Sequence, residues 1–502
     1  MVIREQAYRA LRDALPASNL AAALRCSARL QQALPHPDDL PRNLVLVAFG
    51  GGKDSAYALA FVRTIQLILD RVHGRTFRIR VVTNRHAGMP RAVLENVDRA
   101  YAALRLPDDP DCELLLVDGD EVTPFDVDSP QRDHVVRRNR LDILMTGHRT
   151  FADGRPTFCN ACNLSVVNSF GLAASYGDGA DVFITGDSQQ EQRQYALWVG
   201  RLARRLAPPR TSSQPNGVGR LLSHIDRVAQ VYFTDIHGPG AAADVIEQRR
   251  VASEVPDRLR FFSIYEDTQY AAGDHLELLT GLLGFEFDDL AFSFTESDCG
   301  NPALMAHLRA LKCERVFGRT YAEGMAEYVE FALGLMRKKD FPPELVELMR
   351  ARYEGPGATD RMRRSADGYA YQTFGLTEQQ LVCMAFSPFA GKGTGLAEFL
   401  AREHPGLADH AGAIHALLAS ESEPVAGEPE PAGELAAELA RISGLELAQL
   451  RVLYRSSLRT PSANPAGTDV IDTVLVGDPH KAVIETRHTK DGPNTYELIS
   501  GR

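Results

Sequence analysis

The sequence lacks the features that mark several classes of protein. No stretch approaches the ~20 consecutive apolar residues that a membrane-spanning helix needs. The first 30 residues carry five arginines together with Glu5 and Asp13, so this segment does not form the apolar core of a signal peptide. The net charge is −11, and no basic segment of the kind that nucleic-acid binders usually carry dominates the chain. We therefore expect a cytoplasmic protein that does not bind a membrane.

Cysteine is scarce and scattered. The 502 residues include seven cysteines, an odd number. Such a set argues against a disulfide framework and leaves metal or sulfur chemistry as the reason for any cluster. Cys159 and Cys162 form the one Cys-x-x-Cys spacing in the chain. We expect Cys26, Cys112 and Cys383 to be buried core thiols.

The most informative stretch is residues 44–59, which read LVLVAFGGGKDSAYAL. An apolar run bounded by glycines predicts a buried parallel strand, and apolar positions at helical spacing over 53–72 predict a helix. Three successive glycines, 50–52, separate the two elements. They allow positive φ and let backbone N–H groups face an anion, while the helix N-terminus adds a partial positive charge. The stretch therefore predicts a phosphate-binding loop.

The spacing of this loop distinguishes it from two common nucleotide motifs. It fits neither the Walker pattern G-x-x-x-x-G-K-[ST] nor the dinucleotide pattern G-x-G-x-x-G. It resembles the PP-loop of N-type ATP pyrophosphatases, S-G-G-x-D-S, which is matched in order by Gly51, Gly52, Lys53, Asp54 and Ser55. Gly50 stands where that family usually has serine. An ordinary glycine-rich turn of an α/β sheet is the alternative.

Strand and helix signals alternate through the first half of the chain. Strands are expected over 44–48, 78–83, 113–117, 182–185, 231–235 and 260–265, with helices over 53–72, 91–104 and 164–176 and an irregular stretch over 124–156. The alternation predicts an α/β fold with a parallel, doubly wound, Rossmann-like sheet. Mostly helical segments follow over 321–352, 377–400 and 435–458, and strand-like runs lie between 470 and 499.

The cysteines extend the resemblance beyond the loop. The pair Cys159 and Cys162, followed by Cys299 in a Cys-Gly turn before a helix, resembles the tRNA 2-thiocytidine biosynthesis family of iron-sulfur-dependent thiolation enzymes. The likeness covers about residues 43–312 and includes the Gly88-Met89-Pro90 segment and the strand that ends at Gly186. It implies a [4Fe-4S] cluster on Cys159, Cys162 and Cys299.

The resemblance also implies an ATP-dependent reaction. ATP and Mg²⁺ would bind at the loop, a substrate oxygen would become an adenylate with release of pyrophosphate, and a sulfur nucleophile would displace AMP. The residues expected to bind the nucleotide are Gly50, Gly51, Gly52, Lys53, Asp54, Ser55, Asn84, His86 and Gly186. Asp54, Lys53 and Asp187 are the expected catalytic residues. Relatives tend to have a histidine and two aspartates after the strand at Gly186, where this chain has Asp187 to Glu191 without histidine.

Several alternatives remain open at this point. A structural zinc site is one, with Cys313 or His148 completing the cysteine pair. An amide ligase of the same fold, without a cluster, is the second, and a nucleotide-binding scaffold without turnover is the third. Arg137, Arg138 and Arg140 either bind an anionic substrate or form a solvated helix face. The expected partners are a tRNA, small-molecule or peptide acceptor, a sulfur-donor protein or sulfide, and a second copy in a homodimer.

Length and composition predict several domains, since domains average roughly 150 residues. Residues 401–450 contain nine acidic and two basic side chains, so the acidic excess lies late in the chain. The sequence predicts five segments: an N-terminal helical segment (1–42), a PP-loop ATP-binding domain with the three cysteines (43–315), a helical region (316–420), an acidic linker (421–434) and a small α+β C-terminal module (435–502).

Overall fold

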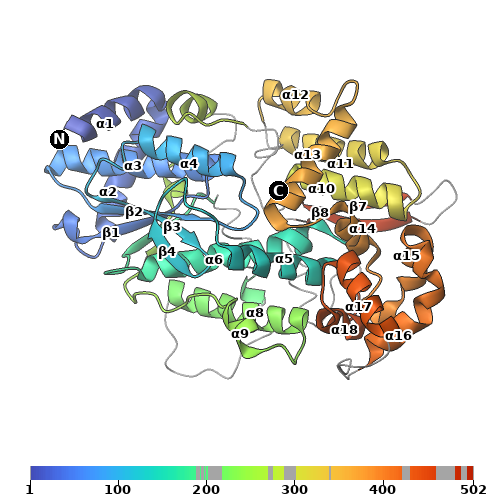
Figure 1. Ribbon diagram of the computed structural model, residues 1–502. Coiled ribbons are helices and arrows are strands. Elements are labelled where there is room, and N and C mark those ends of the chain that lie inside the picture. The colour runs from blue at the N-terminus through green and yellow to red at the C-terminus, as the bar shows by residue number, and fades with distance from the viewer. Residues whose placement is uncertain are drawn as a thin grey trace.

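Six strands form one mixed sheet in one half of the molecule, and helices fill the other half (Figure 1). The computed structural model describes residues 2–187, 193, 197, 199–201, 217–268, 275–287, 301–338, 341–420, 430–459, 481–487 and 494–500. The strands are β1 (Leu44–Ala48), β2 (Arg78–Asn84), β3 (Cys112–Asp118), β4 (Glu121–Pro124), β5 (Val182–Ile184) and β6 (Arg260–Phe261). Their order is β4-β3-β2-β1-β5-β6, and every neighbouring pair is parallel except β3 and β4. The predicted α/β class is confirmed.

Helices cover both faces of the sheet. Val45 and Val47 of β1 join the core formed with α1 to α4, whereas Leu44 and Leu46 join the core formed with α6. A strand buried on both faces is apolar at every position, as the sequence of β1 is. The covering helices are α1 (Val2–Ala14), α2 (Ala17–Ala33), α3 (Lys53–His73), α4 (Arg91–Ala103) and α6 (Asn160–Ser175).

The second half is a helical assembly around one large hydrophobic core. Its helices are α5 (Asp133–Gly147), α8 (Val218–His237), α10 (Pro302–Leu311), α11 (Tyr321–Lys338), α12 (Pro343–Ala351), α13 (Ala358–Phe374), α14 (Glu378–Phe386), α15 (Leu396–Glu403), α16 (Ala411–Ala419), α17 (Glu430–Ser443) and α18 (Leu447–Arg455), with the short α9 (Ala243–Glu247) beside α8. None of the helices in the described part of the chain has the length and apolar character needed to cross a bilayer. This core runs across the predicted boundaries at 315 and 434, because α10, α17 and α18 all contribute to it.

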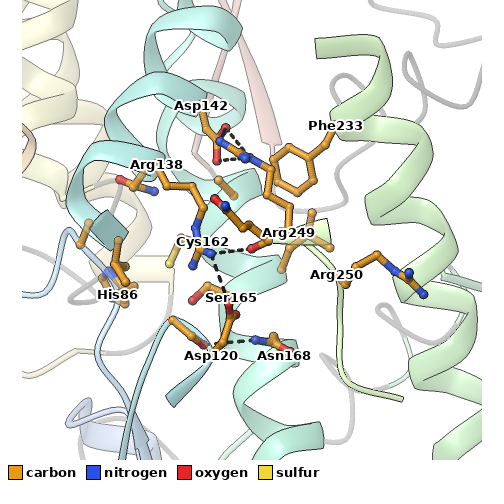
Figure 2. A pocket seen from close by; sticks show the side chains of 17 residues that line it. His86, Asp120, Arg138, Asp142, Cys162, Ser165, Asn168, Phe233, Arg249 and Arg250 are labelled. Carbon is orange, nitrogen blue, oxygen red and sulfur yellow. Dashed lines mark hydrogen bonds and ion pairs between the residues drawn. The ribbon is translucent and has the colours of Figure 1, made fainter. Parts of the chain in front are cut away.

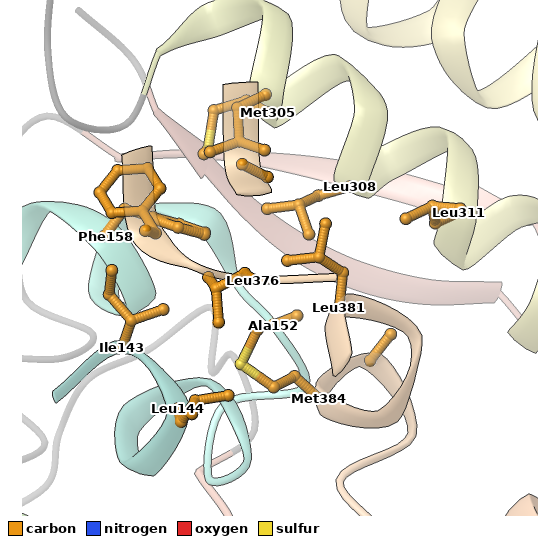
Figure 3. Close-up of a cluster of buried hydrophobic side chains, with 14 of the residues drawn as sticks. Ile143, Leu144, Ala152, Phe158, Met305, Leu308, Leu311, Leu376, Leu381 and Met384 are labelled. Atoms are coloured by element: carbon orange, nitrogen blue, oxygen red, sulfur yellow. The ribbon is translucent and has the colours of Figure 1, made fainter. Parts of the chain in front are cut away.

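The junction between α5 and the later helices is built on close packing (Figure 3). Met384 of α14 and Met305 of α10 lie in the same core cluster as Leu144 of α5. A Cβ atom at Gly147 would overlap the sulfur of Met384, and one at Gly154 would overlap the sulfur of Met305. The two glycines therefore let the helical half pack directly against the segment that leads to the cysteine pair.

A third glycine, Gly171 of α6, yields a stability prediction. A Cβ atom there would overlap the carbonyl oxygen of Ala252, a backbone atom that no rotamer change can move aside. We expect Gly171→Ala to lower the free energy of unfolding by about 1–3 kcal/mol, the usual cost of overpacking. Urea unfolding followed by circular dichroism measures this change.

The matched control is Gly334→Ala in α11, where no neighbouring heavy atom lies within 4 Å of the new Cβ atom. This substitution is expected to leave stability unchanged or to raise it by up to about 1 kcal/mol, through helix propensity alone. Equal unfolding midpoints for the two variants would contradict the close approach of α6 to the segment around Ala252.

Most of the expected elements of the sheet half are observed, two are wrong, and the strand expected over 260–265 is limited to β6 at 260–261. Residues 231–235 belong to α8 rather than to a strand, because the buried positions Leu222, Ala229, Tyr232 and Ile236 follow a helical stripe along 20 residues. The stretch 124–156 is not irregular, since it contains α5. The first half of α5 is polar and its buried residues are concentrated in the second half, so the helical period is not visible locally.

The late part of the chain contains two further strands. β7 (Lys481–Arg487) and β8 (Asn494–Ser500) form an antiparallel pair, and β8 runs beside the π-helical turn Arg155–Cys159. Helix α17 begins at Glu430, so the end of the predicted acidic linker is helical. Residues 421–429, the predicted strand-like run over 470–476 and Cys299 lie outside the described residues.

Candidate functional site

The glycine loop lies between the carboxyl end of β1 and the first turn of α3. Phe49 N–H donates to the Val82 carbonyl at 2.9 Å, so the β1–β2 ladder continues to the edge of the loop. Helix α3 then begins, with Ala56 N–H donating to the Gly52 carbonyl at 2.9 Å. Gly52 occupies the N-cap, and no side chain caps this end of the helix. The first N–H groups of α3 are therefore available to an anion.

Two glycines hold the loop against its neighbours. Gly51 has a φ of +77°, and a Cβ there would lie 2.6 Å from Val93 Cγ1 of α4. At Gly186, directly after Thr185, a Cβ would lie 2.7 Å from the Cα atom of Ser55. The structure thus places Gly186 against the first turn of α3. This contact is what we expect if Gly186 and the loop belong to one site.

The other two glycines of the loop, Gly50 and Gly52, face open space. No heavy atom lies within 4 Å of a Cβ built at Gly50 or at Gly52. Ser55 Oγ donates to the Gly52 carbonyl at 3.0 Å, so this hydroxyl braces the loop and would have to rotate to reach a phosphate. The open side of the loop is accordingly the side on which a ligand would contact backbone N–H groups.

Charged side chains stand at the start of α3. Lys53 Nζ lies 3.4 Å from Asp54 Oδ1, and the two side chains are 11% and 28% exposed. The same ammonium group lies 5.1 Å from the ring centroid of Phe341, a buried residue between α11 and α12. The helical half of the molecule thus helps to position the lysine of the loop.

Two buried polar groups flank the loop without hydrogen-bond partners among the described residues. They are Asn84 Nδ2 at the end of β2 and Thr185 Oγ1 just after β5, in side chains that are each 7% exposed. Leaving a buried polar group unpaired costs about 1–3 kcal/mol, so the pair indicates that a polar ligand belongs at this edge. Thr185 is a functional candidate that the sequence interpretation missed. The sequence could have indicated Thr185, because it directly precedes Gly186, a residue already expected to bind the nucleotide.

The topology places these groups where α/β sheets bind ligands. The chain passes from β1 to β2 on one side, and β5 later joins β1 on the other side, so the strand order reverses at β1. Crevices at the carboxyl ends of strands beside such a reversal are the usual ligand sites of open α/β sheets. The loop, Asn84 and Thr185 all lie at this edge. Asp187 follows two residues after Thr185 and is half-buried.

The cysteine pair lies at the start of α6, a helix that packs on the sheet near the loop. Cys159 and Cys162 are 2% and 5% exposed, and they form a small cluster with Val166 at the start of α6. One turn further, Ser165 Oγ donates to Asn84 Oδ1 at 3.4 Å. Helix α6 therefore connects the pair directly to the strand end beside the loop.

A pocket of about 50 Å³ opens beside Cys162 (Figure 2). His86, which is 8% exposed, lines it together with Ser165. Arg138 of α5 also lines it, and its guanidinium group lies 3.7 Å from Asp120. Of the three arginines on α5, Arg138 therefore faces a candidate site, whereas Arg140 donates to the carbonyls of Gly375 and Gly444 and joins helices together.

Two further arginines and an aromatic ring complete the pocket wall. Arg249 binds the Asp142 carboxylate at 2.8 Å and stacks 5.6 Å from the ring centroid of Phe233. Arg250 binds Asp226 at 2.7 Å. The pocket thus offers a buried thiol, an aromatic ring and arginines that are each paired with an aspartate, and its size suits a small polar molecule.

Among the described residues, His148 and the other cysteines do not complete a metal centre with the pair. In the described residues, neither His148 nor Cys313 joins Cys159 and Cys162 in a set of ligand atoms within 4.8 Å of one another. His148 is fully buried, which lowers its pKa to about 3. Burial raises the pKa of Cys26 and of Cys112 to about 12, as expected of core thiols that remain protonated, although Cys112 is only half-buried.

The loop itself yields a prediction that separates binding from stability. At Gly52, with φ −82°, alanine adds a methyl group that meets no neighbour. We expect Gly52→Ala to change the free energy of unfolding by less than about 1 kcal/mol. It should weaken ATP binding about 10- to 100-fold, because the methyl group displaces one charge-assisted N–H contact. Calorimetric titration with Mg²⁺-ATP measures this, with Gly334→Ala as the control. Unchanged affinity would contradict a nucleotide site here.

Comparisons with protein-family models, with curated proteins and with solved structures found no match to this chain. The function is therefore inferred from the residues and the geometry of the site. Three features carry that inference: an uncapped helix N-terminus behind a glycine loop, two buried polar groups without partners in the described residues, and a cysteine pair on the adjoining helix.

Proposed function

We propose that the chain is a PP-loop enzyme that transfers AMP from ATP to an oxygen of its substrate and releases pyrophosphate. The observation that carries the proposal is the loop before α3, whose N–H groups are uncapped and whose open face carries no side chain. A loop of this kind binds the phosphates of a nucleotide and stabilises charge that develops on them. The match of Gly51 to Ser55 to the PP-loop motif supports ATP as the nucleotide.

The adenylation step can be assigned to residues of this chain. The N–H groups behind Gly52 and the Lys53 ammonium would bind the β- and γ-phosphates of ATP. A substrate oxygen attacks the α-phosphorus, the bond from that phosphorus to the bridging oxygen breaks, and pyrophosphate leaves. Asp54 and Asp187 supply carboxylate oxygens of the kind that Mg²⁺ prefers, and bound Mg²⁺ would neutralise charge on the leaving group. Asn84 and Thr185 would pair with polar atoms of the nucleotide.

The cysteine pair supports sulfur transfer as the second step. Two buried thiols at the start of α6, together with Cys299, would hold a [4Fe-4S] cluster, which would supply an iron without a protein ligand as a site for hydrosulfide. In that step the sulfur nucleophile forms a bond to the adenylated carbon, the carbon–oxygen bond breaks, and AMP leaves. The proton of hydrosulfide passes to solvent, so an oxygen is exchanged for sulfur without a change of oxidation state.

The pocket beside Cys162 supports a polar acceptor. At about 50 Å³ the pocket fits a small polar group rather than a whole nucleotide, and its three arginines are already paired with Asp120, Asp142 and Asp226. The resemblance to the thiolation family supports a tRNA nucleotide, whose base would present such a group, as the acceptor. A small molecule or peptide with the same groups is the alternative acceptor. Sulfide or a sulfur-donor protein would supply the nucleophile.

One assay tests the proposal as a whole. The full chain, purified without oxygen, is incubated with Mg²⁺-ATP, sulfide and total tRNA, and both pyrophosphate and thiolated nucleosides are measured. Pyrophosphate that depends on tRNA, with a thiolated product, is the expected result. Pyrophosphate that appears only with added amines would replace sulfur transfer with amide ligation, which the same loop supports. ATP binding without pyrophosphate under any of these conditions would contradict tRNA as the acceptor and would favour a nucleotide-binding scaffold or a small-molecule or peptide acceptor.

A further inference from the structure

Three potential metal ligands meet in the helical half of the molecule, away from the glycine loop. They are His307 of α10, Asp367 of α13 and Glu378, the first residue of α14. One ligand atom from each lies within 4.8 Å of the other two, and no other group of three His, Cys, Asp or Glu meets this distance among the described residues. We propose that these side chains bind one divalent transition-metal ion.

His307 is held as a ligand would be. Its side chain is fully buried, and Nδ1 lies 2.7 Å from the hydroxyl oxygen of Tyr321. Nε2 is also buried and has no hydrogen-bond partner in the described part of the chain. Metal-binding histidines usually have one ring nitrogen on the ion and the other fixed by a hydrogen bond, which orients the ring. A buried ring nitrogen that lacks any partner is otherwise costly.

The two carboxylates provide the rest of the ligand set. Asp367 Oδ1 is buried and likewise has no partner among the described residues. Glu378 receives hydrogen bonds from Arg363 Nε at 3.0 Å and Nη2 at 2.6 Å. A carboxylate has about four lone-pair sites, so Glu378 can accept from Arg363 and still bind an ion. Arg363 also stacks 4.5 Å from the ring centroid of Tyr321, so it braces both Glu378 and the partner of His307.

The chemistry of the set limits the choice of ion. One imidazole nitrogen and two carboxylate oxygens suit Zn²⁺, Mn²⁺ or Fe²⁺, whereas Ca²⁺ prefers oxygen ligands alone. Two carboxylates balance the charge of a divalent ion. Three protein ligands leave coordination positions for water or for a ligand. The alternative is that Arg363 is the cation of this cluster and that the three side chains form only a structural network.

Metal titration of the full chain tests the proposal independently of the nucleotide site. Cys159→Ser/Cys162→Ser protein is stripped of metal with a chelator and titrated with Co²⁺, whose visible absorption reports bound ion. We expect about one Co²⁺ per chain and no thiolate charge-transfer band, because the ligands are nitrogen and oxygen. Asp367→Asn and His307→Gln are expected to weaken binding at least about 10- to 100-fold.

The matched control is Asp360→Asn, which removes an exposed carboxylate two turns earlier on α13 and should bind Co²⁺ as the parent does. Asparagine has the shape of aspartate, so the Asp367→Asn variant should fold. It can therefore still test the proposal if His307→Gln fails to fold. Tyr321→Phe adds a positioning test: it should weaken Co²⁺ binding less than the loss of a ligand does. A parent protein that binds no Co²⁺, or an Asp367→Asn protein that binds it with unchanged affinity, would overturn the proposal.

Discussion

Asp54→Asn is expected to lower the rate of pyrophosphate release about 10²- to 10³-fold, the usual effect of removing one group that stabilises charge in a transition state. Asp54 is the second residue of α3 and pairs with Lys53 at 3.4 Å. Asparagine preserves its shape but removes the charge that would hold Mg²⁺ and orient Lys53. Steady-state pyrophosphate release under saturating Mg²⁺-ATP measures the change.

The control for this variant lies on the same helix. Asp70→Asn, near the C-terminal end of α3, breaks an ion pair with Arg4 at 2.7 Å. That substitution should lower stability slightly and leave the turnover rate unchanged, because about 16 residues of helix, or ~24 Å, separate the two aspartates. Equal rates for Asp54→Asn and the parent would exclude the loop from the reaction.

Cys162→Ser is expected to abolish the thiolated product while ATP-dependent pyrophosphate release continues. Loss of a ligand removes the cluster, so iron and acid-labile sulfide should fall from about four of each per chain to near zero. Adenylation should persist, because the loop and the first turn of α3 bind ATP whereas Cys162 lies on a different helix, α6. Metal and sulfide analysis after anaerobic purification, beside the product assay, separates the two steps.

Cys299→Ala should reproduce this loss, and Cys112→Ala should not. Burial holds the pKa of Cys112 at about 12, so its thiol stays protonated and is a poor ligand. A parent protein that holds no acid-labile sulfide, and whose zinc is lost in the Cys162→Ser variant, would contradict the cluster. That result would favour the amide ligase or the scaffold over sulfur transfer.

The strand, loop and helix of the candidate site could be predicted from the sequence because all of their signals are local. The apolar run of β1, the three glycines and the helical spacing of α3 lie within about 30 consecutive residues. Each signal reflects a backbone preference or a burial pattern that acts over a few turns. The same holds for β2, β3 and β5, whose predicted positions agree with the structure to within one residue at either end.

Local signals failed where the pattern was incomplete or ambiguous. Val231, Tyr232 and Phe233 have side chains that favour strands, but they belong to α8, whose longer stripe buries Tyr232 and Phe233 on a helix. Helix α5 carries all but one of its buried residues in its second half, so no regular period marks it. In both cases tertiary packing decided the element.

The sequence by itself determined that the chain is an α/β protein with a glycine loop suited to phosphate, because these properties depend on neighbours along the chain. Only the tertiary structure decided which distant residues meet. Phe341 beside Lys53, Ser165 on Asn84, and His307 with Asp367 and Glu378 are separated by tens to hundreds of positions. Such contacts arise from the packing of whole helices against the sheet and against each other, and no local pattern of residues encodes them.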